Sequence, residues 1–274
     1  MGIFTPAETI RNYAKAGIMK TERPVSKQII LSVLAGAFIA FGAAAANTAA
    51  HSIGDVSAAR LISGLIFPFG LGMVLLLGAE LFTGNAMLCV SVWSGDAKLS
   101  KVLRNWAAVY LGNFIGAALL AVLCAWFGQM NYSGGGLAVY TIKLAAAKSV
   151  MPPLNAFMLA IPCNVLVCAG VLCSLSAQDT AGRIAGAYLP VAFFVICGFE
   201  HCVANMYYIP AGIFAAQAPE YAALAAEAGV NLSALTWSHF FLRNLLPVTL
   251  GNLLGGAGFG AAMWFGTQNP KAAA

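Results

Sequence analysis

Long apolar segments recur along this chain, and short polar segments separate them. An α-helix needs roughly 20 residues to cross a bilayer. Six stretches meet that length, and we predict a transmembrane helix in each of them: 29–50, 61–92, 105–128, 154–177, 183–214 and 240–266. The pattern therefore predicts an all-α integral membrane protein. We expect one transmembrane domain over 1–274, with an amphipathic segment at 1–28.

The composition agrees with the apolar pattern. Hydrophobic residues make up 61% of the chain and charged residues only 8%, whereas charged residues are about a quarter of a soluble domain. The net charge of +5 is scattered over segment ends, so we expect no nucleic-acid partner. The seven cysteines all lie in apolar runs, which indicates buried thiols rather than disulfides or a metal centre.

The basic residues predict the orientation in the membrane. With six crossings, both termini lie on one side. Ten of the 14 lysines and arginines fall on that side: Arg11, Lys15, Lys20, Arg23, Lys27, Lys98, Lys101, Arg104, Arg183 and Lys271. The positive-inside rule therefore places both termini in the cytoplasm and the protein in the cytoplasmic (inner) membrane. Within the N-terminal segment, Thr5 and Pro6 predict the start of a short helix, either a solvated interfacial helix or a lid over a gate.

The second and fifth apolar stretches are longer than one crossing requires, and each contains the same acidic motif. Both read Gly-x-Glu-x-x-x-x-Asn, at 78–85 and 198–205. A second pair of matching segments lies at 104–116 and 243–255. We infer two duplicated halves, 29–135 and 136–270, inserted with opposite orientation because each half has three crossings. Inverted repeats with paired broken helices point to a pathway at the membrane midplane.

The polar residues of the two motifs have two interpretations. Acids inside a membrane are costly and either mark a transport pathway or are satisfied by neighbouring groups. The equivalent positions of Glu80 and Glu200 favour a structural role, in which each acid holds its own helix break. We expect Asn85 and Asn205 to support the same breaks by satisfying freed backbone groups.

His201 is the individual feature, because the first motif has Leu81 at that place. Its ordinary pKa near neutrality allows proton exchange with a weak acid. A buried histidine is often only a satisfied core residue, but the matching break opposite favours a pore-facing role. Thr83 in that opposite break offers a hydroxyl that can orient the imidazole or a passing ion. Bulky apolar residues around this polar centre would block bare ions: Phe67, Phe69, Leu71 and Phe194.

Four segments together resemble the formate/nitrite transporter family. They are Gly-Ala-Glu-Leu-Phe-Thr at 78–83, Gly-Phe-Glu-His at 198–201, Ala-Asn-Met at 204–206 and Pro-Val-Thr-Leu-Gly-Asn at 247–252. The resemblance implies a homopentamer of aquaporin-like, six-helix protomers. Each protomer would have its own pore for small monovalent anions or their conjugate acids. It also implies that the N-terminal helix can move to gate the cytoplasmic mouth.

The same resemblance assigns roles to individual residues. It implies that Leu81, Phe82 and Thr83 form the loop of the broken second helix, with Thr83 facing His201. Leu71 is similar to the cytoplasmic constriction and Phe194 to the periplasmic one, with Phe67 nearby. Asn164 and Asn252 match polar positions that support the pore. Lys148 resembles the basic residue that attracts anions to the outer vestibule.

The sequence therefore predicts a transmembrane channel or transporter for small weak-acid anions, with formate favoured and protons as co-substrate. Burying a bare carboxylate is costly, so we expect a proton from His201 or from water to neutralise it. We expect no enzyme activity and no cofactor. Three alternatives stay open: a nitrite or hydrosulfide channel of the same family, a membrane-anchor subunit of a redox enzyme, and a pore for water or neutral solutes.

Overall fold

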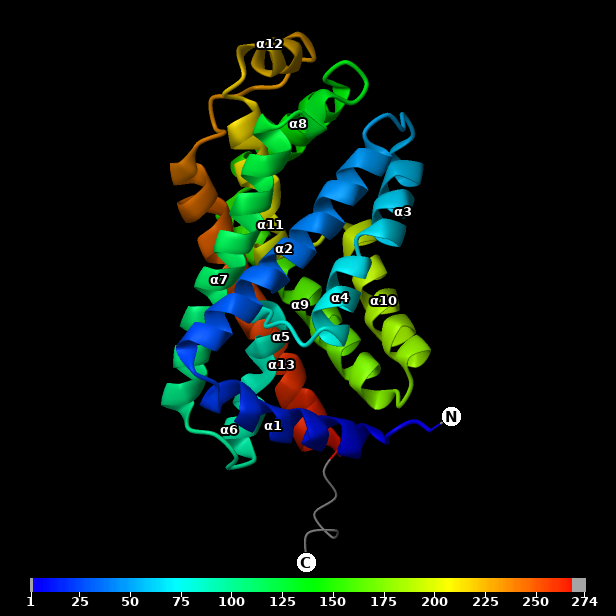
Figure 1. The fold of residues 1–274 in the computed structure, drawn as a ribbon, viewed down its shortest axis with the longest axis vertical. Helices are drawn as coiled ribbons and strands as arrows, with labels where there is room; N and C mark the ends of the chain where they lie inside the picture. Colours follow the sequence, from blue (N-terminus) through cyan, green and yellow to red (C-terminus); the bar gives the residue numbers. More distant parts are fainter. Residues whose placement is uncertain (1, 268–274) are drawn as a thin grey trace, which may run out of the picture.

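The computed structural model describes residues 2–267, which form a bundle of helices (Figure 1). The main helices of the predicted crossings are α2 (Val25–Ala50), α3 (Val56–Ile66), α4 (Phe69–Leu76), α7 (Leu99–Trp126), α9 (Pro153–Ser176), α10 (Thr180–Cys197), α11 (Cys202–Ala215) and α13 (Leu246–Thr267). The other elements are α1 (Pro6–Glu22), α5 (Phe82–Asn85), η1 (Ala86–Leu88), α6 (Cys89–Trp93), η2 (Gln129–Asn131), α8 (Gly136–Val150), α12 (Pro219–Glu227) and the π-helix η3 (His239–Leu245).

The six predicted crossings and both predicted breaks are confirmed. Six helical segments are long and apolar enough to span a bilayer, and they correspond in order to the six predicted stretches. The second is interrupted between α4 and α5, and the fifth between α10 and α11. The short apolar helices after the breaks complete the two crossings. This protein is therefore an all-α integral membrane protein with two broken helices.

The two halves pack their outer helices by the same device. In the first half, a Cβ on Gly116 of α7 would lie only 2.0 Å from the carbonyl oxygen of Val33 on α2. In the second half, a Cβ on Gly255 of α13 would lie 2.2 Å from the carbonyl oxygen of Ile161 on α9. Glycine is needed at both places because the helix backbones touch there. The predicted repeat is thus visible in the packing.

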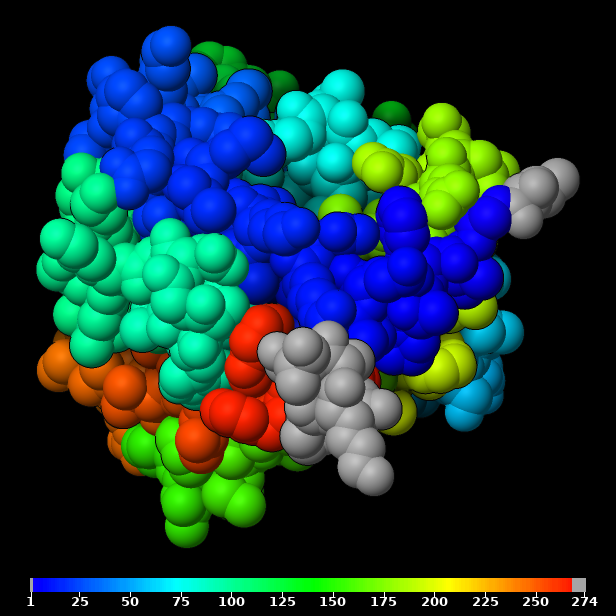
Figure 2. Space-filling model, turned by 90° about the horizontal axis from the view of Figure 1, so that it is seen from below, coloured from blue at the N-terminus to red at the C-terminus, as the bar shows by residue number. Residues whose placement is uncertain are grey.

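Helix α1 lies across the end of the bundle where α13 ends (Figures 1 and 2). Thr5 caps it as predicted, and the backbone N–H of Thr5 donates to Glu8 Oε2 at 2.8 Å. The helix is docked on the first broken crossing, because the Tyr13 hydroxyl donates to the carbonyl of Gly84 at 2.8 Å. Thus the N-terminal segment covers one end of the bundle.

The sequence pattern did not predict α8, which lies towards the opposite end of the bundle (Figure 1). Its 15 residues span about 22 Å at 1.5 Å per residue, too short to cross a bilayer. One face is buried against α11, and Lys148 lies in its last turn. The boundaries of the two halves, 29–135 and 136–270, stay a prediction; Lys271 and residues 268–270 lie outside the described residues.

Candidate functional site

The first break begins where α4 ends, at Gly78. This glycine has φ +69°, in the left-handed region that residues with a Cβ avoid. The chain then runs extended, and the N–H of Glu80 donates to the carbonyl of Leu31 on α2 at 3.2 Å. Helix resumes at Phe82. The break is therefore a built connection, held to a neighbouring helix.

The second break repeats this construction. Gly198 has φ +71° at the end of α10, and the N–H of Glu200 donates to the carbonyl of Leu159 on α9 at 3.3 Å. Helix resumes at Cys202, with His201 as the residue that caps α11. The two motifs found in the sequence therefore fold alike.

One asparagine brackets each break. Asn113 Oδ1 accepts from the N–H of Phe82 at 2.9 Å, and its Nδ2 donates to the carbonyl of Glu80 at 2.9 Å. Asn252 Oδ1 accepts from the N–H of Cys202 at 2.8 Å, and its Nδ2 donates to the carbonyl of Glu200 at 3.0 Å. These side chains satisfy the backbone groups that the missing helical turn leaves free, which membrane depth requires.

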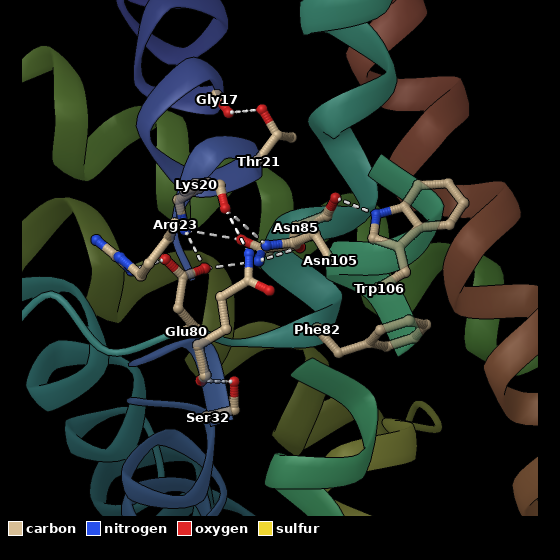
Figure 3. A network of polar contacts seen from close by, with 12 residues as sticks. Gly17, Lys20, Thr21, Arg23, Ser32, Glu80, Phe82, Asn85, Asn105 and Trp106 are labelled. Atoms are coloured by element: carbon tan, nitrogen blue, oxygen red, sulfur yellow. Dashed lines mark hydrogen bonds and ion pairs between the residues drawn. The ribbon is translucent and has the colours of Figure 1, made fainter. Parts of the chain in front are cut away.

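The first carboxylate is held by α1 (Figure 3). Lys20 Nζ lies 3.0 Å from Glu80 Oε2, and Arg23 pairs with the other carboxylate oxygen. Asn85 Nδ2 donates to Glu80 Oε2 at 2.7 Å and to Asn105 Oδ1 at 3.0 Å. Glu80 itself is only 1% exposed. A buried carboxylate needs charged or polar partners, and two cations and one amide provide them here.

The second carboxylate has one cation. Lys148 Nζ of α8 lies 2.6 Å from Glu200 Oε1. Asn205 Nδ2 donates to Glu200 Oε2 at 2.7 Å and to Asn244 Oδ1 at 2.8 Å. The geometry is consistent with the structural role predicted for both acids, since each is tied to its own break.

His201 and Thr83 meet between the two breaks. His201 Nε2 lies 2.9 Å from Thr83 Oγ1, and His201 Nδ1 accepts from the N–H of Ala204 at 3.0 Å. A backbone N–H only donates, so the neutral ring carries its proton on Nε2 and donates it to Thr83. The Phe194 ring is stacked on the imidazole, with centroids 5.6 Å apart. The histidine is thus buried, neutral in this geometry and fixed in orientation.

Two cavities approach this pair from opposite ends. The smaller, of about 190 Å³, lies under α1 and includes Leu71, Leu81 and Gly84 in its lining. The larger, of about 590 Å³, lies between α3, α8 and the second break and reaches His201. Thr83 links them, because its neighbour Gly84 lines the smaller cavity and its hydrogen-bond partner His201 lines the larger one. This arrangement is a polar pair between two recesses.

The structure places the other predicted residues as follows. Phe67 and Phe194 line the larger cavity, with ring centroids 5.6 Å apart. Phe82 is buried with its ring 4.8 Å from that of Tyr110. Asn164 Nδ2 donates to the carbonyls of Thr83 at 3.2 Å and of Asn252 at 2.6 Å. The roles of these residues in a pathway stay predictions.

Sequence reasoning missed the cations that hold Glu80. It treats Lys20 and Arg23 only as solvated charges of the N-terminal segment. A signal is nevertheless present: Lys20 precedes Leu31 by 11 residues, as Lys148 precedes Leu159 by 11 residues. The duplication therefore extends to α1 and α8, whose lysines bind equivalent carboxylates.

Comparison with known proteins decides the family. The profile of the formate/nitrite transporter family matches residues 7–266. The chain belongs to this family. A "Probable formate transporter" of Methanothermobacter thermautotrophicus is 36% identical over 281 residues, which cover 96% of both proteins. The "Formate channel FocA" of Haemophilus influenzae is 38% identical over 200 residues, which cover 72% of this chain and 70% of that protein.

Solved structures agree with this family assignment. A "Pentameric formate channel with formate bound" superposes with a TM-score of 0.78 at 34% identity, covering 88% of this chain and 96% of that one. An "FNT family ion channel" superposes with a TM-score of 0.81 at 26% identity, covering 95% and 99%. This formate/nitrite transporter family member therefore has the predicted fold, that of a channel or transporter.

Proposed function

We propose that this protein is a transmembrane channel for small monovalent anions of weak acids, with formate as its main substrate. The observation that carries the proposal is the buried hydrogen bond between His201 and Thr83, at the point where two cavities approach each other. The formate channels among its relatives support the choice of substrate. Nitrite, which the family name includes, is the second candidate.

The apolar residues beside the pair require a neutral or well-solvated substrate. Leu71 lies on one side, and Phe67 and Phe194 lie on the other. A bare carboxylate would lose its hydration there at a prohibitive cost, whereas formic acid would pass. Protonation therefore accompanies passage, and flux rises when the uptake side is acidified.

We place the source of the proton in cavity water rather than on the ring. Protonating His201 at Nδ1 would break its bond with the N–H of Ala204. The neutral ring instead keeps its proton on Nε2 and donates it to Thr83 Oγ1, and the Thr83 hydroxyl hydrogen remains available for a passing oxygen atom. His201 is thus a fixed hydrogen-bond donor that orients Thr83.

The test is uptake of labelled formate, nitrite and hydrosulfide into proteoliposomes across the range of about pH 5 to 8, which brackets the ordinary histidine pKa. We expect formate uptake to rise steadily as the outside becomes acidic. Uptake that stays constant over this range would remove proton coupling. His201→Phe deletes both ring bonds, so we expect it to lower formate uptake at every pH in this range; wild-type uptake in that variant would remove the histidine from the mechanism.

The same proposal includes a homopentamer in the cytoplasmic membrane with both termini in the cytoplasm. A pentameric relative supports the assembly, and the excess of basic residues on the terminal side supports the orientation. Native mass spectrometry in detergent measures the subunit number. Labelling of single cysteines placed near residue 3 and in α12 from each side of the membrane measures the orientation.

A further inference from the structure

The larger cavity is lined by more cations than are needed to balance Glu200 at the second break. Its lining includes Arg60, Lys143 and Lys148 but only one carboxylate, Glu200. Lys148 is committed to that carboxylate, at 2.6 Å. Within residues 2–267, neither Arg60 nor Lys143 has an acidic oxygen within 4.0 Å. Two cations therefore remain uncompensated at this end of the pathway.

Arg60 is the more closely placed of these two cations. A Cβ on Gly198 would lie 2.9 Å from Arg60 Nη1 and 3.3 Å from Cζ, so the guanidinium rests directly on the second break. At the equivalent Gly78 of the first break, a Cβ would meet nothing within 4 Å. The carbonyl end of α10 favours a cation at this spot. The contact with Gly198 explains the position of the guanidinium, but it forms no hydrogen bond with the guanidinium N–H groups.

Those N–H groups are free to bind a ligand. In the described part of the chain, the Arg60 guanidinium makes no hydrogen bond to a protein acceptor. Arg60 precedes Phe67 by seven residues along α3, which corresponds to roughly 10 Å of helix. Lys148 Nζ lies 5.8 Å from the ring centre of Tyr208, which lines the same cavity. An anion in this cavity thus meets Arg60 before the aromatic constriction.

We propose that Arg60 forms an oxyanion-binding site in the larger cavity, and that it holds a small carboxylate or another planar monovalent oxyanion before the anion reaches Phe67 and Phe194. This inference rests on the proposed function and names a selectivity residue for it. A guanidinium pairs with two oxygens of one planar anion. Hydrosulfide offers a single sulfur atom and cannot give each N–H its own acceptor, so it gains less from this fork. Arg60 therefore favours formate and nitrite over hydrosulfide.

The test compares Arg60→Gln, Arg60→Lys and the matched control Lys143→Gln, which removes a cation of the same cavity away from the break. In proteoliposomes we expect Arg60→Gln to raise KM for formate about tenfold, the loss of one charged hydrogen-bonded contact, with kcat changed little. Arg60→Lys keeps the charge but loses the fork, so formate KM stays raised. Arg60 and Lys143 are both exposed, so their bare charges are screened alike. Lys143→Gln should change KM less than about twofold because an ammonium lacks the planar fork of the guanidinium.

Hydrosulfide is the internal control for selectivity. We expect its KM to change much less than the formate KM in Arg60→Gln. Equal changes for the two anions, or equal effects of Arg60→Gln and Lys143→Gln, would overturn the site and leave only a diffuse positive potential. Size-exclusion profiles and thermal unfolding of each variant in detergent show whether it is folded. If Arg60→Gln does not fold, the same comparison of formate and hydrosulfide KM is made with Arg60→Lys.

Equilibrium binding separates this inference from the proposed function. The thermal midpoint of the detergent-solubilised protein is measured against sodium formate concentration, which requires no transport. We expect formate to raise the midpoint of the wild type, with the response weakened in Arg60→Gln. If the wild type carries formate but Arg60→Gln binds and transports it unchanged, only the site is wrong. If the wild type carries no formate yet binds it through Arg60, only the proposed function is wrong.

Discussion

The two broken crossings are held by the same set of contacts, a shared frame, and they differ in the side chains that this frame positions. In both, a glycine with positive φ ends a helix, a glutamate N–H reaches a carbonyl of the neighbouring helix, and an asparagine brackets the gap. The residue after the glutamate then differs: Leu81 in the first break and His201 in the second. The frame is therefore duplicated, whereas the imidazole is present once.

The cations around the two breaks differ as well. Glu80 is held by Lys20 of α1 and by Arg23 directly after α1, and Lys20 Nζ also donates to Asn85 Oδ1 at 2.7 Å. At the second break Lys148 pairs with Glu200, and the equivalent buried Asn205 Oδ1 has no hydrogen-bond partner among residues 2–267. The first break is thus closed over by α1. The second is less completely satisfied and faces the larger cavity.

The largest predicted effect tests the shared frame. Asn113→Ala and Asn252→Ala each remove three hydrogen bonds to backbone groups. At about 1 kcal/mol or more per buried unsatisfied group, we expect each to destabilise the protein by about 3 kcal/mol or more. Asn47→Ala, which removes one long bond of 3.4 Å, is the control. Chemical unfolding in detergent measures this, and clearly unequal losses at the two breaks would contradict a shared frame.

The next prediction separates the two carboxylates. Glu200→Gln leaves Lys148, only 13% exposed, without a counter-charge, and we expect a loss of about 3 kcal/mol. Glu80→Gln leaves Lys20 and Arg23, 25% and 27% exposed, which can turn to water, so its loss should be about half as large.

A second substitution checks the cause. Adding Lys148→Met to Glu200→Gln removes the unpaired charge, and we expect it to restore part of the stability. Unfolding midpoints of the two single variants and the double variant form the cycle. If the double variant is less stable than Glu200→Gln, the unpaired lysine is not the source of the loss.

At the hydrogen bond between Thr83 and His201, we expect a substitution to lower the stability less than the changes above and to lower formate flux strongly. Thr83→Val removes the acceptor of the His201 Nε2 proton and leaves that buried group unsatisfied, at a cost of about 2 kcal/mol. Since the hydroxyl also orients the substrate in the proposed mechanism, we expect formate flux to fall about tenfold or more. Thr83→Ser keeps the oxygen and should retain most of the flux. A Thr83→Val variant with full flux would show that the hydroxyl is dispensable.

The sequence predicted the duplicated features of the chain. It missed the contacts between residues that are far apart in the chain and meet only in the folded protein. The paired Gly-x-Glu motifs were sufficient to predict two broken crossings, because helix interruption and a buried acid are local features of the chain. The partners of Glu80 lie on α1, about 60 positions away in the chain, and no local pattern reveals such a contact. α8 was missed because its apolar run is shorter than a crossing. Only the equal spacing of Lys20 and Lys148 from their neighbouring spans links α8 to α1.

The smallest predicted effect concerns how α1 and α8 begin, since these helices carry the lysines of the two breaks. α1 has a reciprocal cap between Thr5 and Glu8, whereas α8 begins at a left-handed Gly135 with no side-chain cap. The pKa of Glu8 is lowered from 4.5 by hydrogen bonds from the Thr5 backbone N–H and then its hydroxyl. A lowered folded pKa means that the Glu8 carboxylate contributes its part of the cap fully above pH 4.5 and loses it as the pH falls through the lower value.

We therefore expect Thr5→Ala to speed amide hydrogen exchange in α1 and to leave α8 unchanged, because only α1 uses a side-chain cap. The ratio of exchange in the variant to that in the wild type should fall as the pH drops through the lowered pKa of Glu8, because the bond from the Thr5 hydroxyl to the Glu8 carboxylate is then lost. It should stay above unity, because the Thr5 hydroxyl still accepts from the N–H of Glu8 at 3.3 Å in the wild type alone. A ratio that does not change with pH would show that Glu8 contributes nothing to α1. Faster exchange spreading from α1 to the Glu80 break would instead show that this cap helps to hold α1 over the smaller cavity.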